Sequence, residues 1–91
     1  NEIELNFSNE INVYPNPVHD QLSILINGNY GTYWKYKVLD MTGKLLLKGE
    51  SEWPYQQVNV SSLAHGIYQI VIEYDNFVFN GIKVQHFRKD D

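Results

Sequence analysis

The sequence predicts an all-β protein, an immunoglobulin-like antiparallel β-sandwich of seven or eight short strands. Apolar and polar residues alternate along most of the chain, which is the period of a strand with one buried face. Helical periodicity is nearly absent, and clusters of Gly, Pro, Asn and Asp separate the alternating runs. A chain of 91 residues is long enough for one such domain and too short for two.

The first third of the chain contains strands on either side of a proline-rich break. Residues 1–10 are expected to form either a linker or a first strand, because apolar residues occupy alternate positions there: Ile3, Leu5 and Phe7. A short strand then holds Ile11 and Val13. Pro15 and Pro17 end its pairing, since proline fixes φ and lacks an N–H donor. The next strand places three apolar residues on one face: Leu22, Ile24 and Ile26.

The middle of the chain predicts a hairpin after a loop at 27–31. The first strand of this hairpin alternates apolar residues with lysines, the apolar positions being Trp34, Tyr36 and Val38. A turn follows at 40–44, because Asp40 can bond its own turn backbone and Gly43 can adopt a positive φ. Residues 45–47 return as the partner strand, and a polar loop over 49–54 comes next.

A short strand at 58–60 is followed by one helical or 3₁₀ turn over 61–66. In this turn Ser61 caps the start, Leu63 fills the core and Gly66 reverses the chain.

The final hairpin consists of two longer alternating runs. Its first strand carries Tyr68, Ile70, Ile72 and Tyr74. Asp75-Asn76 suits a two-residue turn, and residues 77–84 return beside the first strand.

Composition and charge exclude several function classes. The net charge is −4, and the seven basic residues are scattered among eleven acidic ones, so no basic face for nucleic acid is expected. No apolar run approaches the roughly 18 residues of a membrane span. The chain has no cysteine, which excludes thiol nucleophiles and Cys-based zinc sites. Because Asn1 is not a start methionine and opens no signal peptide, we expect the chain to be cut from a longer precursor.

Residues that could support catalysis or hold a metal are isolated from one another. His19-Asp20 has no nucleophile elbow beside it and is better interpreted as part of a polar loop. His65 and His86 lack the short spacing of a metal-ligand pair. We therefore expect no catalytic residue, no cofactor and no metal in this chain, while the longer protein that carries it can itself be an enzyme.

Five aromatic residues could form a platform for sugars: Tyr30, Tyr33, Trp34, Trp53 and Tyr55. A structural role fits the two tryptophans better. Trp34 lies in an alternating strand and is expected between the sheets, and Trp53, beside Pro54, is expected to cover an edge of the core.

Four motifs in order resemble the C-terminal sorting domains of the type IX (Por) secretion system. They are Val13-Tyr14-Pro15-Asn16-Pro17 followed by Leu22-Ser23-Ile24; Val38-Leu39-Asp40-Met41-Thr42-Gly43-Lys44-Leu45; Val60-Ser61-Ser62-Leu63-Ala64-His65-Gly66-Ile67-Tyr68; and Lys83-Val84-Gln85. Together they span about residues 11–85. The segment His86-Phe87-Arg88-Lys89-Asp90-Asp91 runs past the usual end of this family.

The resemblance implies a sorting domain over 11–86 and a tail over 87–91. Such a domain directs a passenger protein from the periplasm of a gram-negative bacterium across the outer membrane, to the cell surface or the medium. Its implied partners are the outer-membrane machinery and a surface peptidase, which cuts in or before residues 1–10.

The resemblance also implicates particular residues. Recognition by the machinery is expected at Gly66, Phe77, Phe79, Lys83, Val84 and Gln85. The family motif comprises Pro15, Asn16, Pro17, Leu22, Asp40, Gly43, Lys44, Leu63, Gly66 and Tyr68. The alternating segment at the end of the chain can accept a partner strand or support a weak homodimer. The alternative function is an immunoglobulin-like accessory module for adhesion or carbohydrate binding.

Overall fold

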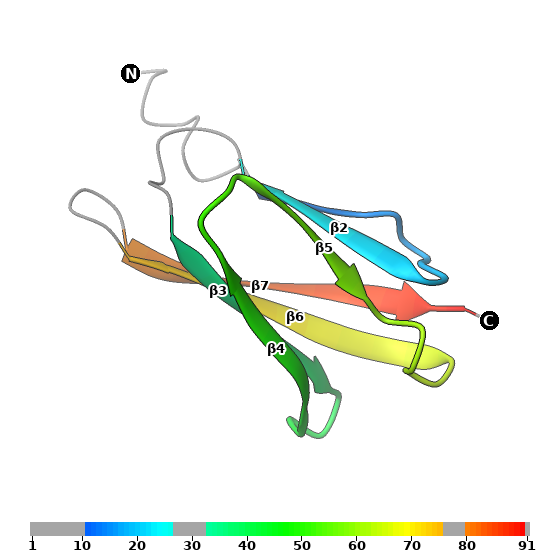
Figure 1. Ribbon diagram of the computed structural model, residues 1–91. Coiled ribbons are helices and arrows are strands. Elements are labelled where there is room, and N and C mark those ends of the chain that lie inside the picture. Colours follow the sequence, from blue (N-terminus) through cyan, green and yellow to red (C-terminus); the bar gives the residue numbers. More distant parts are fainter. Residues whose placement is uncertain (1–10, 27–32, 76–79, 91) are drawn as a thin grey trace, which may run out of the picture.

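The computed structural model describes residues 11–26, 33–75 and 80–90, which form two sheets (Figure 1). One sheet contains β1 (Ile11–Tyr14), β2 (Gln21–Ile26) and β5 (Tyr55–Asn59), in the order β1-β2-β5. The other contains β3 (Trp34–Asp40), β4 (Leu45–Ser51), β6 (Gly66–Asp75) and β7 (Asn80–Lys89), in the order β4-β3-β6-β7. All neighbouring strands are antiparallel. The described residues thus confirm the predicted all-β sandwich, and the strand order is that of an immunoglobulin-like domain.

The core lies between the two sheets and follows from the alternation in the sequence. Its largest fully buried side chains come from both sheets and from the two segments that hold Val18 and Val60: Phe87, Leu22, Ile24, Ile70, Ile72, Val18, Val38 and Val60. Leu22, Ile24 and Ile26 share the inner face of β2, as predicted. Because this chain has no disulfide, apolar burial at about 25 cal/mol per Å² is the main contribution that holds the sheets together.

The two tryptophans have different environments. Trp34 is buried between the sheets, which confirms the prediction, and its Nε1–H donates to the carbonyl oxygen of Trp53 at 2.7 Å. The side chain of Trp53 is 71% exposed, so the expectation that it covers an edge of the core was wrong. Its backbone carbonyl, not its ring, is the part that serves the fold.

The hairpin turn between β3 and β4 forms as predicted. Asp40 Oδ1 accepts hydrogen bonds from the backbone N–H groups of Thr42 (2.9 Å) and Lys44 (3.0 Å) and from Thr42 Oγ1 (2.6 Å). Gly43 has φ of 91°, where a side chain would be strained. These hydrogen bonds, first of all that from the Thr42 hydroxyl, lower the pKa of Asp40. The motif residues Asp40, Gly43 and Lys44 therefore build one turn.

Residues 61–66 form a turn but no helix, so the predicted helical or 3₁₀ turn is confirmed only as a single turn with i→i+3 spacing. The chain makes a simple turn in which Leu63 N–H donates to Val60 O at 3.0 Å, and Asn59 Oδ1, not Ser61, is the capping acceptor. Leu63 is only partly buried against the core. Gly66 begins β6 without a positive φ, and a Cβ there would meet nothing closer than 3.9 Å, so it does not reverse the chain.

Several strand ends differ from the prediction. The loop expected over 49–54 is shorter, because β4 continues to Ser51 and β5 begins at Tyr55. The last strand, expected over 77–84, continues to Lys89, so most of the predicted 87–91 tail is strand. The predictions for 1–10, 27–31 and Asn76 lie outside the described residues, as do Phe77 and Phe79.

Candidate functional site

β7 is an edge strand and the final strand of the described chain. It pairs with β6 along ten residue pairs, from Gly66↔Lys89 to Asp75↔Asn80. On its other side, among the described residues, β-pairing is confined to one parallel bridge between Val18 and Lys89. Figure 1 shows β7 at the border of the four-stranded sheet, with its end near the chain terminus. A long edge of this kind offers backbone groups to a partner strand.

The side chains of β7 divide between the two faces of its sheet. Phe87 faces the core and is 2% exposed, and Lys83 and Gln85 lie half-buried on the same inner face, opposite Ile72 and Ile70. The outer face carries apolar side chains instead, since Ile82 is 66% and Val84 is 50% exposed. The inner face of this strand is thus polar in its middle, and the apolar residues point to solvent.

The open part of the β7 edge can be located from its hydrogen bonds. Arg88 turns its N–H and its C=O away from β6, toward Asn16 Oδ1 (2.9 Å) and Val18 N–H (2.8 Å). Because the direction of the backbone groups alternates along an antiparallel strand, Ile82, Val84 and His86 turn theirs the same way. These three residues form the open edge of β7.

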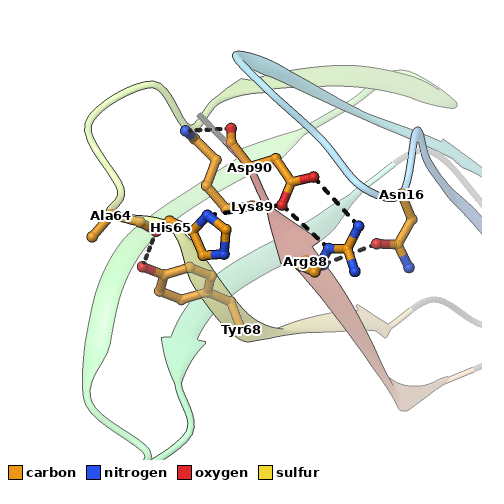
Figure 2. Close-up of polar contacts among 7 residues, drawn as sticks. All are labelled: Asn16, Ala64, His65, Tyr68, Arg88, Lys89 and Asp90. Carbon is orange, nitrogen blue, oxygen red and sulfur yellow. Dashed lines mark hydrogen bonds and ion pairs between the residues drawn. The ribbon is translucent and has the colours of Figure 1, made fainter.

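The end of β7 is fastened by the segment after β1. In addition to the two hydrogen bonds of Arg88, Asp90 N–H donates to Val18 O at 2.9 Å, and the Val18 side chain is fully buried. Arg88 also pairs with Asp90, with Nε 3.2 Å from Oδ1 (Figure 2). We refer to Asn16, Val18, Arg88 and Asp90 as the C-terminal clasp. Within the clasp, the side chain of the motif residue Asn16 binds the backbone near the end of β7.

The buried ring of Tyr68 packs against β7 next to the clasp. It stacks on Phe87 with ring centroids 5.7 Å apart and donates its hydroxyl to Ala64 O at 2.6 Å (Figure 2). The motif residue Tyr68 thereby joins the 61–66 turn to the end of β7. Sequence reasoning missed this region, and Phe87 was the one available signal, an aromatic residue at alternating spacing after Lys83 and Gln85.

The residues predicted for recognition do not all lie together. Lys83, Val84 and Gln85 are consecutive on β7, beside its open edge. Gly66 pairs with Lys89 at the other end of the hairpin, which is six residues, or roughly 20 Å, from Lys83. Phe77 and Phe79 lie outside the described residues.

The ionisable side chains near the clasp form no catalytic set. His19, His65, Arg88 and Asp90 line a shallow depression, in which His65 Nδ1 is 4.0 Å from Asp90 Oδ1. A nucleophile bonded to a base is not formed there, and the described residues contain no group of three or more side chains placed to hold a metal ion. The described part of the chain also has no helix long and apolar enough to cross a membrane.

The fold and its edge strand define the class of small immunoglobulin-like β-sandwich domains. The comparison with protein families is more specific, because the model of the secretion system C-terminal sorting domain matches residues 12–83. The chain belongs to this family and is a type IX secretion sorting signal. Such a domain is not itself catalytic, and it serves export to the cell surface or beyond.

A solved structure has the same fold. The chain is similar to part of PorZ, described as an essential bacterial surface component of the type-IX secretion system of Porphyromonas gingivalis. The TM-score is 0.68 at 22% identity, and the match covers 94% of this chain and 12% of the PorZ chain. A comparison with curated protein sequences gave no match.

Proposed function

We propose that the type IX machinery recognises this domain by adding a strand to the open edge of β7. The observation that carries the proposal is the outward direction of the N–H and C=O groups of Ile82, Val84 and His86, next to the exposed side chains of Ile82 and Val84. Main-chain hydrogen bonds supply affinity in strand addition, and the alternate side chains supply specificity. The clasp limits the open edge, because it occupies the outward groups of Arg88.

The predicted recognition residues have different places in this proposal. Val84 contacts the partner directly, through its backbone and its exposed side chain. Lys83 and Gln85 lie half-buried on the inner face of β7, and they contact the partner only at the border of the recognised surface. Phe77 and Phe79 remain part of the proposed surface, while Gly66 acts only as the distant end of the hairpin.

In this proposal the longer protein folds in the periplasm of a gram-negative bacterium, and its passenger then crosses the outer membrane. A surface peptidase cuts in or before residues 1–10, and the passenger, which can be an enzyme, stays on the surface or is released. The support for these steps is the family to which the chain belongs. The same edge supports a weak homodimer, which competes with the machinery for β7.

The test is a proline substitution at the open edge. Val84→Pro removes an N–H that points away from β6, so the β6–β7 ladder retains its hydrogen bonds, and proline is accepted at such edge positions. Val84→Ala is the matched control, since it trims the side chain and keeps the donor. Both are fused behind an inert reporter, ahead of Asn1, in a host with the machinery and in one without it.

We expect the Val84→Pro fusion to stay in the periplasm and the Val84→Ala fusion to reach the surface or the medium. Circular dichroism and thermal melting of the isolated variants check that both fold. Normal export of a folded Val84→Pro variant contradicts strand addition. Equal export in both hosts contradicts the sorting role of this chain, and light scattering of the wild type shows whether a dimer occupies the edge.

A further inference from the structure

The outer face of the three-stranded sheet has an unusual composition. Strand register places two rows of residues across it, Asn12–Leu25–Tyr55 and Tyr14–Ser23–Gln57. Successive side chains of a strand point to opposite faces, so these six lie on the side away from the core, with Ile11, Val13, Ile24 and Val58 on the core side. Ser23 is only 6% exposed, because its hydroxyl lies against that of Tyr55. We refer to the six residues of the two rows as the uncharged face.

The uncharged face differs from the other outer face of the sandwich. None of its six residues is ionised at neutral pH, although 20% of the chain is Asp, Glu, Lys or Arg. The outer face of the four-stranded sheet carries charges instead, including Lys35, Lys37 and Glu73, of which Lys37 and Glu73 form an ion pair at 3.4 Å. The absence of charge is therefore a property of one face.

Two tyrosines flank the middle of this face. Tyr14 on β1 is 43% exposed and Tyr55 on β5 is 42% exposed, with β2 between them. Strand spacing and rise place their Cα atoms roughly 12 Å apart. The hydroxyl of Tyr55 lies 3.0 Å from Ser23 Oγ, a hydrogen bond that fixes the ring across β2. Held in this way, a ring presents an apolar surface beside a polar group at little entropic cost.

Amide groups lie next to each ring. Asn12 shares a row with Tyr55, and Gln57 shares a row with Tyr14; both amides are exposed. An amide offers two donors and an acceptor, which suits a ligand that is both donor and acceptor. Leu25 is the single aliphatic side chain of the face and is half-buried, so the face has little to offer a purely apolar partner.

We propose that the uncharged face binds a neutral polysaccharide. The apolar faces of sugar rings stack on Tyr14 and Tyr55, and sugar hydroxyls bond to the amides of Asn12 and Gln57. Absence of charge removes the attraction that a nucleic acid, an acidic peptide or an anionic membrane requires. This site shares only Tyr55 with the expected aromatic platform, in which Trp34 cannot take part because it is buried. It lies on the opposite sheet from β7 and does not depend on the sorting role.

The experiment is native affinity electrophoresis of the 91-residue chain in gels that contain a soluble neutral polysaccharide. Mixed-linkage β-glucan, mannan and dextran are the probes, and anionic alginate is the charged comparison. The variants are Tyr14→Ala and Tyr55→Ala. Tyr33→Ala is the matched control, since Tyr33 is an exposed tyrosine just before β3, outside the uncharged face, where its hydroxyl donates to Glu50.

We expect at least one neutral probe to retard the wild type and Tyr33→Ala, and each face variant to lose at least tenfold in affinity. Tyr55→Phe, which keeps the ring and loses the bond to Ser23, should weaken binding less than Tyr55→Ala. Failure of all three neutral probes, equal retardation by alginate, or equal loss in Tyr33→Ala overturns the proposal. So does sedimentation that shows a dimer broken by Tyr14→Ala, because a second copy then covers the face.

Discussion

Replacement of Phe87 by alanine tests whether the last residues of the chain belong to the fold. Phe87 lies within residues 87–91, which sequence reasoning treats as a tail, and substitution in a tail has almost no effect on stability. In the structure its side chain is 2% exposed and stacks on Tyr68. The two descriptions therefore predict very different free energies of unfolding.

The magnitude follows from burial. Truncation of a buried phenylalanine to alanine costs about 3–5 kcal/mol, from lost apolar transfer and from the cavity that remains. A 91-residue domain has a total stability of about 5–14 kcal/mol at the usual value per residue. Phe87→Ala thus removes a large fraction of the stability and lowers the melting temperature by more than about 10 °C.

The assay is urea unfolding followed by tryptophan fluorescence, because the buried Trp34 reports on the interior. Val84→Ala is the control in the same strand, and its exposed side chain limits the expected loss to about 1 kcal/mol or less. A loss below about 1 kcal/mol for Phe87→Ala would show that β7 ends before Phe87, and the reasoning about the clasp would then be wrong.

Three further predictions concern single turns and contacts. Gly43→Ala should cost about 1–2 kcal/mol in urea unfolding because φ is 91° there, whereas Gly66→Ala should change stability by less than about 0.5 kcal/mol; equal losses would contradict the turn assignment. The lowered pKa of Asp40 stabilises the fold above the carboxyl's unfolded pKa, and this contribution is lost as pH falls through the lower folded pKa. Asp40→Asn should remove that part of the pH dependence, and an unchanged profile would show that Asp40 contributes nothing to it. Asn16→Ala should cost about 0.5–1.5 kcal/mol and speed hydrogen exchange at Arg88 N–H, and unchanged exchange would exclude the Asn16 contact.

Much of the fold was predictable because most strands obey a simple alternation. β2, β3 and β6 place their apolar residues inward, so periodicity alone identifies their buried faces. The Asp40–Lys44 turn was predictable as well, since each of its residue types has a known local function.

The end of β7 was not predictable in the same way, because its pattern is inverted. The apolar residues Ile82 and Val84 point outward, and the inner positions hold Lys83 and Gln85 before the core resumes at Phe87. Alternation therefore indicates the wrong face in the middle of the strand. The prediction for Gly66 was also wrong. A glycine after a polar segment is typical of a chain reversal, but in the structure Gly66 begins β6 without a positive φ.

The clasp connects the first family motif to the strand that we propose is recognised. Asn16 and Val18 precede β2, yet they bind backbone groups of Arg88 and Asp90, more than 60 residues later in the chain. Their hydrogen bonds form only when the two sheets have assembled, so the open edge of β7 is bounded by the clasp only in the folded domain. If the machinery recognises that edge, it selects domains that have finished folding as well as domains that carry the right residues. On this reasoning Asn16→Ala should weaken export of a reporter more than its modest loss of stability explains, since it loosens the end of β7 without removing a residue from the recognised surface.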